Sequence, residues 1–86
     1  MSVKVYSTDY CPYCRAAEAL LRAKGVPFDH IDVSNDDAMR VKLVEMTGGR
    51  RTVPQIFIHG ESIGGFTELR ALVSTGRFDE MLAAGA

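Results

Sequence analysis

The chain contains two cysteines, Cys11 and Cys14, which are separated only by Pro12 and Tyr13. A pair at this spacing can form half of a zinc site, a structural disulfide or a redox-active dithiol. A structural disulfide across so short a loop would remove little entropy from the unfolded chain. Two incidental core cysteines are a further alternative, but this pair stands between a predicted strand and a predicted helix, as redox dithiols do. The pattern favours a redox-active dithiol.

A zinc site needs four ligands, and the sequence offers no second cysteine pair to complete one. His30 and His59 both fall on predicted strands, at spacings from Cys11 and Cys14 that match no common zinc-ligand pattern. We therefore expect no bound metal ion.

The two cysteines are expected to have different roles, because they stand at different places on one helix. Cys11 lies where the first predicted strand turns into this helix, and Pro12 suits its first turn, where no backbone donor is required. A thiol there faces unpaired backbone N–H groups and the positive end of the helix dipole, which favour the thiolate. Cys14 lies one turn further on, more shielded yet within reach of Cys11. Cys11 is thus the predicted nucleophile, and Cys14 resolves the mixed disulfide.

Hydrophobic periodicity predicts one compact α/β domain over residues 1–86, in the order β-α-β-α-β-β-α with a short C-terminal helix. The first two strands are joined through a helix and must be parallel, whereas the last two form a hairpin, so the sheet is mixed. Ser34 is the predicted hydroxyl cap of the second helix. The expected strands are 3–7, 28–33, 55–59 and 61–63. The first expected helix has Pro12 in its first turn and helical periodicity over residues 15–24, and the others begin near residues 34, 67 and 78.

The composition excludes several classes of protein. The chain is 47% apolar and 24% charged, with a net charge of -1, as in ordinary globular proteins. Its basic residues are spread out, with Arg50-Arg51 the one doublet, so we expect neither nucleic-acid nor membrane binding. No apolar run approaches the ~18 residues that span a bilayer, and the N-terminus does not resemble a signal peptide. A cytoplasmic, reducing location is expected, where a lone cysteine pair is more often catalytic than structural.

Three stretches together resemble the glutaredoxin family: CPYC at 11–14, TVPQIFI at 52–58 and GGFTEL at 64–69. The resemblance extends over nearly the whole chain. It implies a thioredoxin-type α/β fold, with a four-stranded mixed sheet flanked by helices. It also implies a glutathione-dependent thiol–disulfide oxidoreductase that reduces protein disulfides and glutathionylated proteins. Glutathione would be a co-substrate, with no bound cofactor, and the protein would be a monomer.

The resemblance further implies how glutathione binds. The Val53-Pro54 peptide bond would be cis, and the Val53 backbone would pair with the cysteinyl part of glutathione. The amides from Gly65 to Thr67 would take the γ-glutamyl carboxylate, although Thr67 could also be a plain helix cap. Arg50, with Arg51 as an alternative, would face the glycyl carboxylate. The glutathione-binding residues implied in this way are Cys11, Tyr13, Arg50, Thr52, Val53, Pro54, Gly65, Phe66 and Thr67.

The sequence departs from the family pattern near the dithiol and near the third helix. Thr8 stands where many members have a basic residue, Asp9 follows it, and Thr67 replaces a frequent aspartate. Thr8 and Phe66 leave open a redoxin that takes electrons from thioredoxin reductase without glutathione. A module that holds an iron–sulfur cluster between two protomers is a third alternative, but Pro12 argues against it, because cluster binding in the family goes mainly with non-proline loops.

Overall fold

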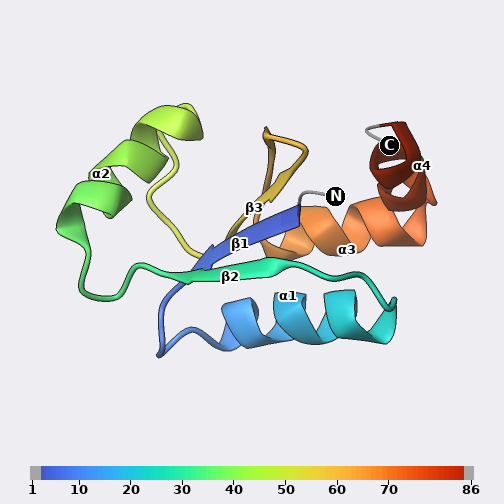
Figure 1. The fold of residues 1–86 in the computed structure, drawn as a ribbon, viewed down its shortest axis with the longest axis horizontal. Coiled ribbons are helices and arrows are strands. Elements are labelled where there is room, and N and C mark those ends of the chain that lie inside the picture. The colour runs from blue at the N-terminus through green and yellow to red at the C-terminus, as the bar shows by residue number, and fades with distance from the viewer. Residues whose placement is uncertain (1–2, 85–86) are drawn as a thin grey trace.

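The computed structural model describes residues 3–84, which form four strands and four helices in the predicted order (Figure 1). The strands are β1 (Val3–Ser7), β2 (Asp29–Asp32), β3 (Gln55–Ile58) and β4 (Glu61–Gly64). The helices are α1 (Pro12–Ala23), α2 (Asp37–Met46), α3 (Phe66–Ser74) and α4 (Arg77–Ala84).

The four strands form one mixed sheet in the order β2-β1-β3-β4. β1 pairs in parallel with β2 and antiparallel with β3, and β4 extends the sheet as the antiparallel partner of β3. Parallel neighbours need a crossover, which α1 provides. Figure 1 shows α1 and α2 on opposite sides of the sheet. The predicted mixed sheet with flanking helices is therefore confirmed.

The larger core cluster lies between the sheet and helices α1, α3 and α4. Val5 of β1 and Ile56 of β3 are direct cross-strand partners, and neither side chain is exposed. Leu21, Leu69 and Phe78 cover them from the three helices, also without exposure. Burial of each such side chain stabilises the fold by about 1.5–3 kcal/mol. This packing fixes α1, and with it the dithiol, against β1.

A smaller cluster lies on the opposite face of the sheet, beneath α2. Tyr6 and Phe57 project there because successive residues of a strand point to opposite faces. Their rings meet edge to face, with centroids 5.4 Å apart. Leu43 of α2 and Val33, which follows β2, complete this cluster. The chain between α2 and β3 is thereby held beside the end of β1.

α1 starts at Pro12, which confirms the expected place of Pro12 in the first turn, and the Cys11 sulfur caps the helix by accepting a hydrogen bond from the Cys14 amide. The predicted Ser34 cap of α2 is wrong: Asp36 caps it, accepting from the Met39 amide at 3.0 Å. The Ser34 hydroxyl lies instead 2.6 Å from the Asp32 carboxylate. Within residues 3–84, no helix combines the length and apolar character needed to cross a membrane.

Candidate active site

Cys11 lies at the N-terminus of α1, where its side chain takes the place of a capping hydroxyl. Its backbone is extended, with φ -103° and ψ 105°, and Pro12 begins the helix. The Cys11 sulfur accepts a hydrogen bond from the Cys14 backbone N–H at 3.1 Å, and the thiol donates to the Val53 carbonyl at 3.5 Å. An N–H donor aimed at the sulfur stabilises negative charge on it. The expected position of Cys11 at the strand-to-helix turn is confirmed.

Cys14 lies one turn into α1 and is 2% exposed. Burial, followed by the hydrogen bond with Cys11 and the negative charges of Cys11 and Glu18, raises the pKa of the Cys14 thiol to about 12. A hydrogen bond with the Thr8 backbone acts in the opposite direction but is outweighed. Both cysteines are free thiols. Cys14 therefore remains protonated at neutral pH, so the two thiols differ in position and in chemistry.

Asp9, the acidic residue ahead of the dithiol, is tied to the loop after β2. Its carboxylate accepts from the Ser34 hydroxyl at 2.9 Å, and its amide N–H donates to the same hydroxyl oxygen at 2.9 Å. The Arg15 guanidinium donates to the Asp9 carbonyl at 3.4 Å. These contacts give Asp9 a structural role in joining two loops.

A groove of about 240 Å³ runs from the dithiol loop to the start of α3. It contains every predicted glutathione-binding residue except Cys11, which contacts its wall through the Val53 carbonyl. Pro54 is buried, and the Val53–Pro54 bond is cis, as the sequence resemblance implied. The groove is lined by Tyr13, Arg50, Thr52, Val53, Pro54, Gly65, Phe66, Thr67 and Glu68. Residues far apart in sequence are thus brought to one side of the dithiol.

Two aromatic side chains flank the groove near Cys11. Tyr13 is 65% exposed, and its ring centroid lies 6.3 Å from that of Phe66 at a tilted angle. The guanidinium of Arg70 lies 5.8 Å from the Phe66 ring centroid on its own helix. The two rings give the groove an apolar, exposed side on which a thioether or peptide stem can pack.

Glu68 is a groove residue that the sequence reasoning missed. Its carboxylate accepts from the Gly65 backbone N–H at 2.7 Å and lies 3.1 Å from the Arg50 guanidinium. The Gly65 hydrogen bond, followed by the charge and hydrogen bond of Arg50, lowers the pKa of the Glu68 carboxyl despite some desolvation. The residue that caps α3 is Gly65, whose backbone N–H donates to the Glu68 carboxylate, so the alternative of a Thr67 cap is wrong. The sequence signal that could have predicted this contact is a glutamate three residues after the N-cap, here Glu68 after Gly65.

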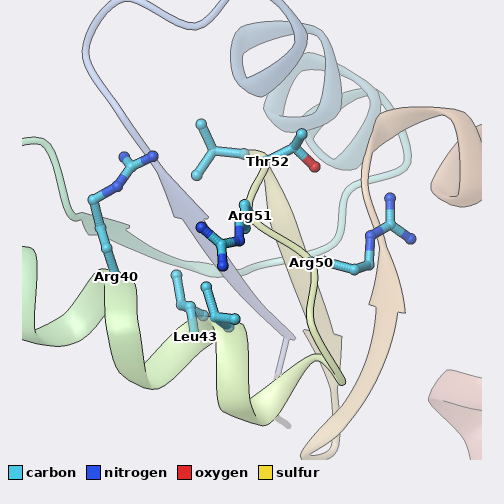
Figure 2. A pocket seen from close by; sticks show the side chains of 7 residues that line it. Arg40, Leu43, Arg50, Arg51 and Thr52 are labelled. Atoms are coloured by element: carbon cyan, nitrogen blue, oxygen red, sulfur yellow. The ribbon is translucent and has the colours of Figure 1, made fainter.

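Arg50 and Arg51 point in different directions (Figure 2). Arg50 extends toward β4 and α3, where it meets Glu68. Arg51 lies on the side of α2, where with Arg40 and Leu43 it lines a small neighbouring pocket that Arg50 also borders. Only Arg50 of this doublet lines the groove beside the dithiol. Of the two alternatives for a basic groove residue, the geometry supports Arg50.

Comparisons with known proteins point to one family. The glutaredoxin family model matches residues 3–63. Glutaredoxin 3 of Escherichia coli K12 is 42% identical over 81 residues, which cover 94% of this chain and 96% of that protein. The solution structure of glutaredoxin from Brucella melitensis has a TM-score of 0.87 at 41% identity and covers 100% of this chain and 92% of that one.

A buckwheat glutaredoxin crystallised as its glutathione complex is also similar in fold. Its TM-score is 0.89 at 31% identity, with 96% of this chain and 77% of that chain covered. Family model, sequence relatives and solved structures agree with the thioredoxin-like sheet and with the paired cysteines at the start of α1. The chain therefore belongs to the glutaredoxin family of glutathione-dependent thiol–disulfide oxidoreductases.

Proposed function

We propose that Cys11 is the nucleophile of this oxidoreductase and that Cys14 resolves the mixed disulfide that Cys11 forms. The observation that carries this assignment is the inequality of the two thiols. The Cys11 sulfur lies at a helix N-terminus, accepts a backbone N–H and adjoins the groove. Cys14 is 2% exposed and has a pKa raised to about 12, so it stays a thiol until a disulfide forms beside it.

The reaction on a protein disulfide takes two exchange steps. The Cys11 thiolate attacks one substrate sulfur, and the other substrate sulfur leaves as a thiolate that takes up a proton. Cys14 then loses its proton and attacks the Cys11 sulfur, which releases the second substrate thiolate and leaves an intramolecular disulfide. Two glutathione molecules reduce this disulfide and become glutathione disulfide. On a glutathionylated protein, Cys11 retains the glutathionyl group, and one further glutathione removes it.

Glutathione is proposed to lie in the groove with its sulfur at Cys11. The Val53 backbone would pair with the cysteinyl peptide of glutathione, and the Tyr13 and Phe66 rings would pack against the apolar part of its chain. The glycyl carboxylate would lie near Arg50 and Thr52. The γ-glutamyl carboxylate would bind the amides opening α3, which carry the positive end of its dipole. The buckwheat relative was crystallised as its glutathione complex, which supports the binding of glutathione by this chain.

The proposed setting is the cytoplasm, and the proposed working form is a monomer over residues 1–86. The proposed partners are glutathione, disulfide-bonded proteins and glutathionylated proteins. The near-zero net charge supports the proposal that neither nucleic acid nor a membrane is a partner. In residues 3–84, no group of three or more His, Cys, Asp and Glu side chains is arranged to hold a metal ion. The proposed chemistry requires none.

A coupled assay tests the electron source. The reduced protein is given a small glutathione mixed disulfide together with glutathione, glutathione reductase and NADPH. We expect steady NADPH oxidation that saturates with glutathione. A parallel reaction replaces glutathione and its reductase with thioredoxin reductase, where we expect no turnover. Turnover in the second reaction alone would replace the proposal with a glutathione-independent redoxin.

A further inference from the structure

Gln55, the first residue of β3, carries a polar side chain into an apolar part of the core. It is 0% exposed, and its direct cross-strand partner is Tyr6 of β1. Phe57, two residues further along β3, points to the same face of the sheet, where Phe57 and Tyr6 belong to the smaller core cluster. The reaction proposed above gives Gln55 no role.

The carboxamide of Gln55 is used on one side only. Its Nε2 donates to the Thr52 carbonyl at 2.7 Å and lies 3.4 Å from the Thr52 hydroxyl oxygen. Its Oε1 is buried, and no group within residues 3–84 donates to it. A buried acceptor without a donor is costly, and an apolar side chain of the same length would avoid this cost. Packing therefore does not explain a glutamine at this position, whereas the contact with Thr52 does.

The contact with Thr52 orients the peptide unit that joins Thr52 to Val53. The Thr52 carbonyl and the Val53 N–H belong to this one planar trans unit and point in opposite directions. Because Gln55 draws the carbonyl toward the core, the Val53 N–H is turned away from the core, in a segment that lines the groove. Within residues 3–84 this N–H donates to no backbone carbonyl. It is therefore available to a ligand in the groove.

We propose that Gln55 is a positioning residue for glutathione, which fixes the Thr52–Val53 peptide unit so that the Val53 N–H faces the cysteinyl carbonyl of the bound tripeptide. The proposal rests on the binding of glutathione in the groove, as proposed above. A donor that is already held in place loses little conformational entropy when the ligand binds, so the affinity rises. The same segment presents the Val53 carbonyl to the Cys11 thiol at 3.5 Å. Gln55 thus acts through Val53 and does not itself line the groove.

Gln55→Met tests this role, because it keeps the length of the side chain and removes both polar atoms. In the reductase-coupled assay we expect KM for a small glutathione mixed disulfide to rise about fivefold, the effect of one hydrogen bond, with kcat unchanged. Reduction of cystamine, which has no peptide group, should proceed at the wild-type rate. This split between KM and kcat, and between the two substrates, would not follow from a general loss of structure.

Ile58→Val is the matched control, since it trims a buried side chain at the other end of β3, away from the groove. It should lower the midpoint of urea unfolding and leave KM within about twofold of the wild type. Gln55→Met should lower that midpoint less than Ile58→Val does, because the unpaired Oε1 is removed together with the Thr52 contact. Weaker glutathione binding in the more stable of the two variants separates positioning from folding.

NMR on the protein with its own Gln55 gives a second test, which holds if Gln55→Met does not fold. Gln55 and Asn35 are the chain's only side chains with a carboxamide, so the spectrum contains two such NH₂ groups. The Gln55 group should exchange hydrogen with solvent more slowly than that of the exposed Asn35. In Cys14→Ser, its signal should also shift when Cys11 carries glutathione, because hydrogen bonds in a chain polarise one another.

Two results would overturn the inference: an unchanged KM in folded Gln55→Met, or a Gln55 signal that glutathione on Cys11 does not move. Absence of glutathione-dependent turnover in the wild type would instead contradict the proposed function.

Discussion

Arg50 and Glu68 form an ion pair across the groove beside the dithiol, with 3.1 Å between guanidinium nitrogen and carboxylate oxygen. The same carboxylate oxygen accepts the Gly65 backbone N–H at 2.7 Å. Glu68 thus occupies the Arg50 guanidinium and the Gly65 N–H, two groups that are proposed to bind the carboxylates of glutathione. Both side chains are about two-fifths exposed, so the pair is screened by solvent and can separate when a ligand binds.

Arg50→Gln tests the basic side of this pair. We expect KM for glutathione in the reductase-coupled assay to rise about fivefold, since a partly exposed charge contact is worth about 1 kcal/mol. Arg51→Gln is the matched control, because Arg51 points toward α2 and should leave KM within about twofold (Figure 2). Equal effects of the two substitutions would show that general positive charge, and not the Arg50 contact, attracts glutathione.

Glu68→Gln tests the acidic side. The amide can still accept the Gly65 N–H but carries no charge, so Arg50 gains net charge for an incoming carboxylate. We expect KM for glutathione to fall by about fivefold, on the same order-of-magnitude scale. The dependence of KM on ionic strength should steepen as well, because the groove becomes more positive. A rise in KM would show that the Glu68 carboxylate itself contacts glutathione, for example at its ammonium group.

The predictable part of this molecule depended on local patterns. The alternating residues of β1, the turn at Pro12 and the glycines before α3 each specify an element within a few residues of themselves. The capping of α2 was not predictable in this way. Ser34 is a good cap by type, but Asp32 and Asp9 engage its hydroxyl, and Asp9 is 25 residues away in sequence. Such competition depends on how the loops meet in three dimensions.

In the candidate site, too, some features depend on local sequence patterns and others on tertiary packing. Most groove residues beside Cys11 lie in the three short motifs, and the structure places them together with Arg50, which precedes the second motif, and with Glu68, which was not predicted. The pairing of Arg50 with Glu68 joins residues 18 apart, and the contact of His30 with Glu18 joins a strand to a helix. No local pattern contains these contacts, because each exists only once the sheet and helices have packed. The catalytic roles themselves remain predictions.

Serine substitutions of the two cysteines test their division of labour. Cys11→Ser should lose all measurable reductase activity, because a serine hydroxyl is a far weaker nucleophile than a thiolate. Cys14→Ser should keep activity on a small glutathione mixed disulfide but lose most reduction of a protein disulfide. The two substrates are to be measured side by side in the reductase-coupled assay. Equal loss on both substrates in Cys14→Ser would contradict the separate roles.

The high pKa of Cys14 predicts a specific loss of stability in alkali. Folding raises the pKa of this thiol from 9.0 to about 12, so between these values the folded protein binds a proton that the unfolded chain has released. The stabilisation is fully present below about pH 9 and is lost as pH rises toward 12. Urea unfolding under reducing conditions, at pH 8 and at pH 10.5, measures it against Cys14→Ser. We expect the wild type to lose more unfolding free energy between these pH values than Cys14→Ser, because serine does not titrate there; an equal loss would mean that Cys14 ionises in the folded protein as readily as in the unfolded one.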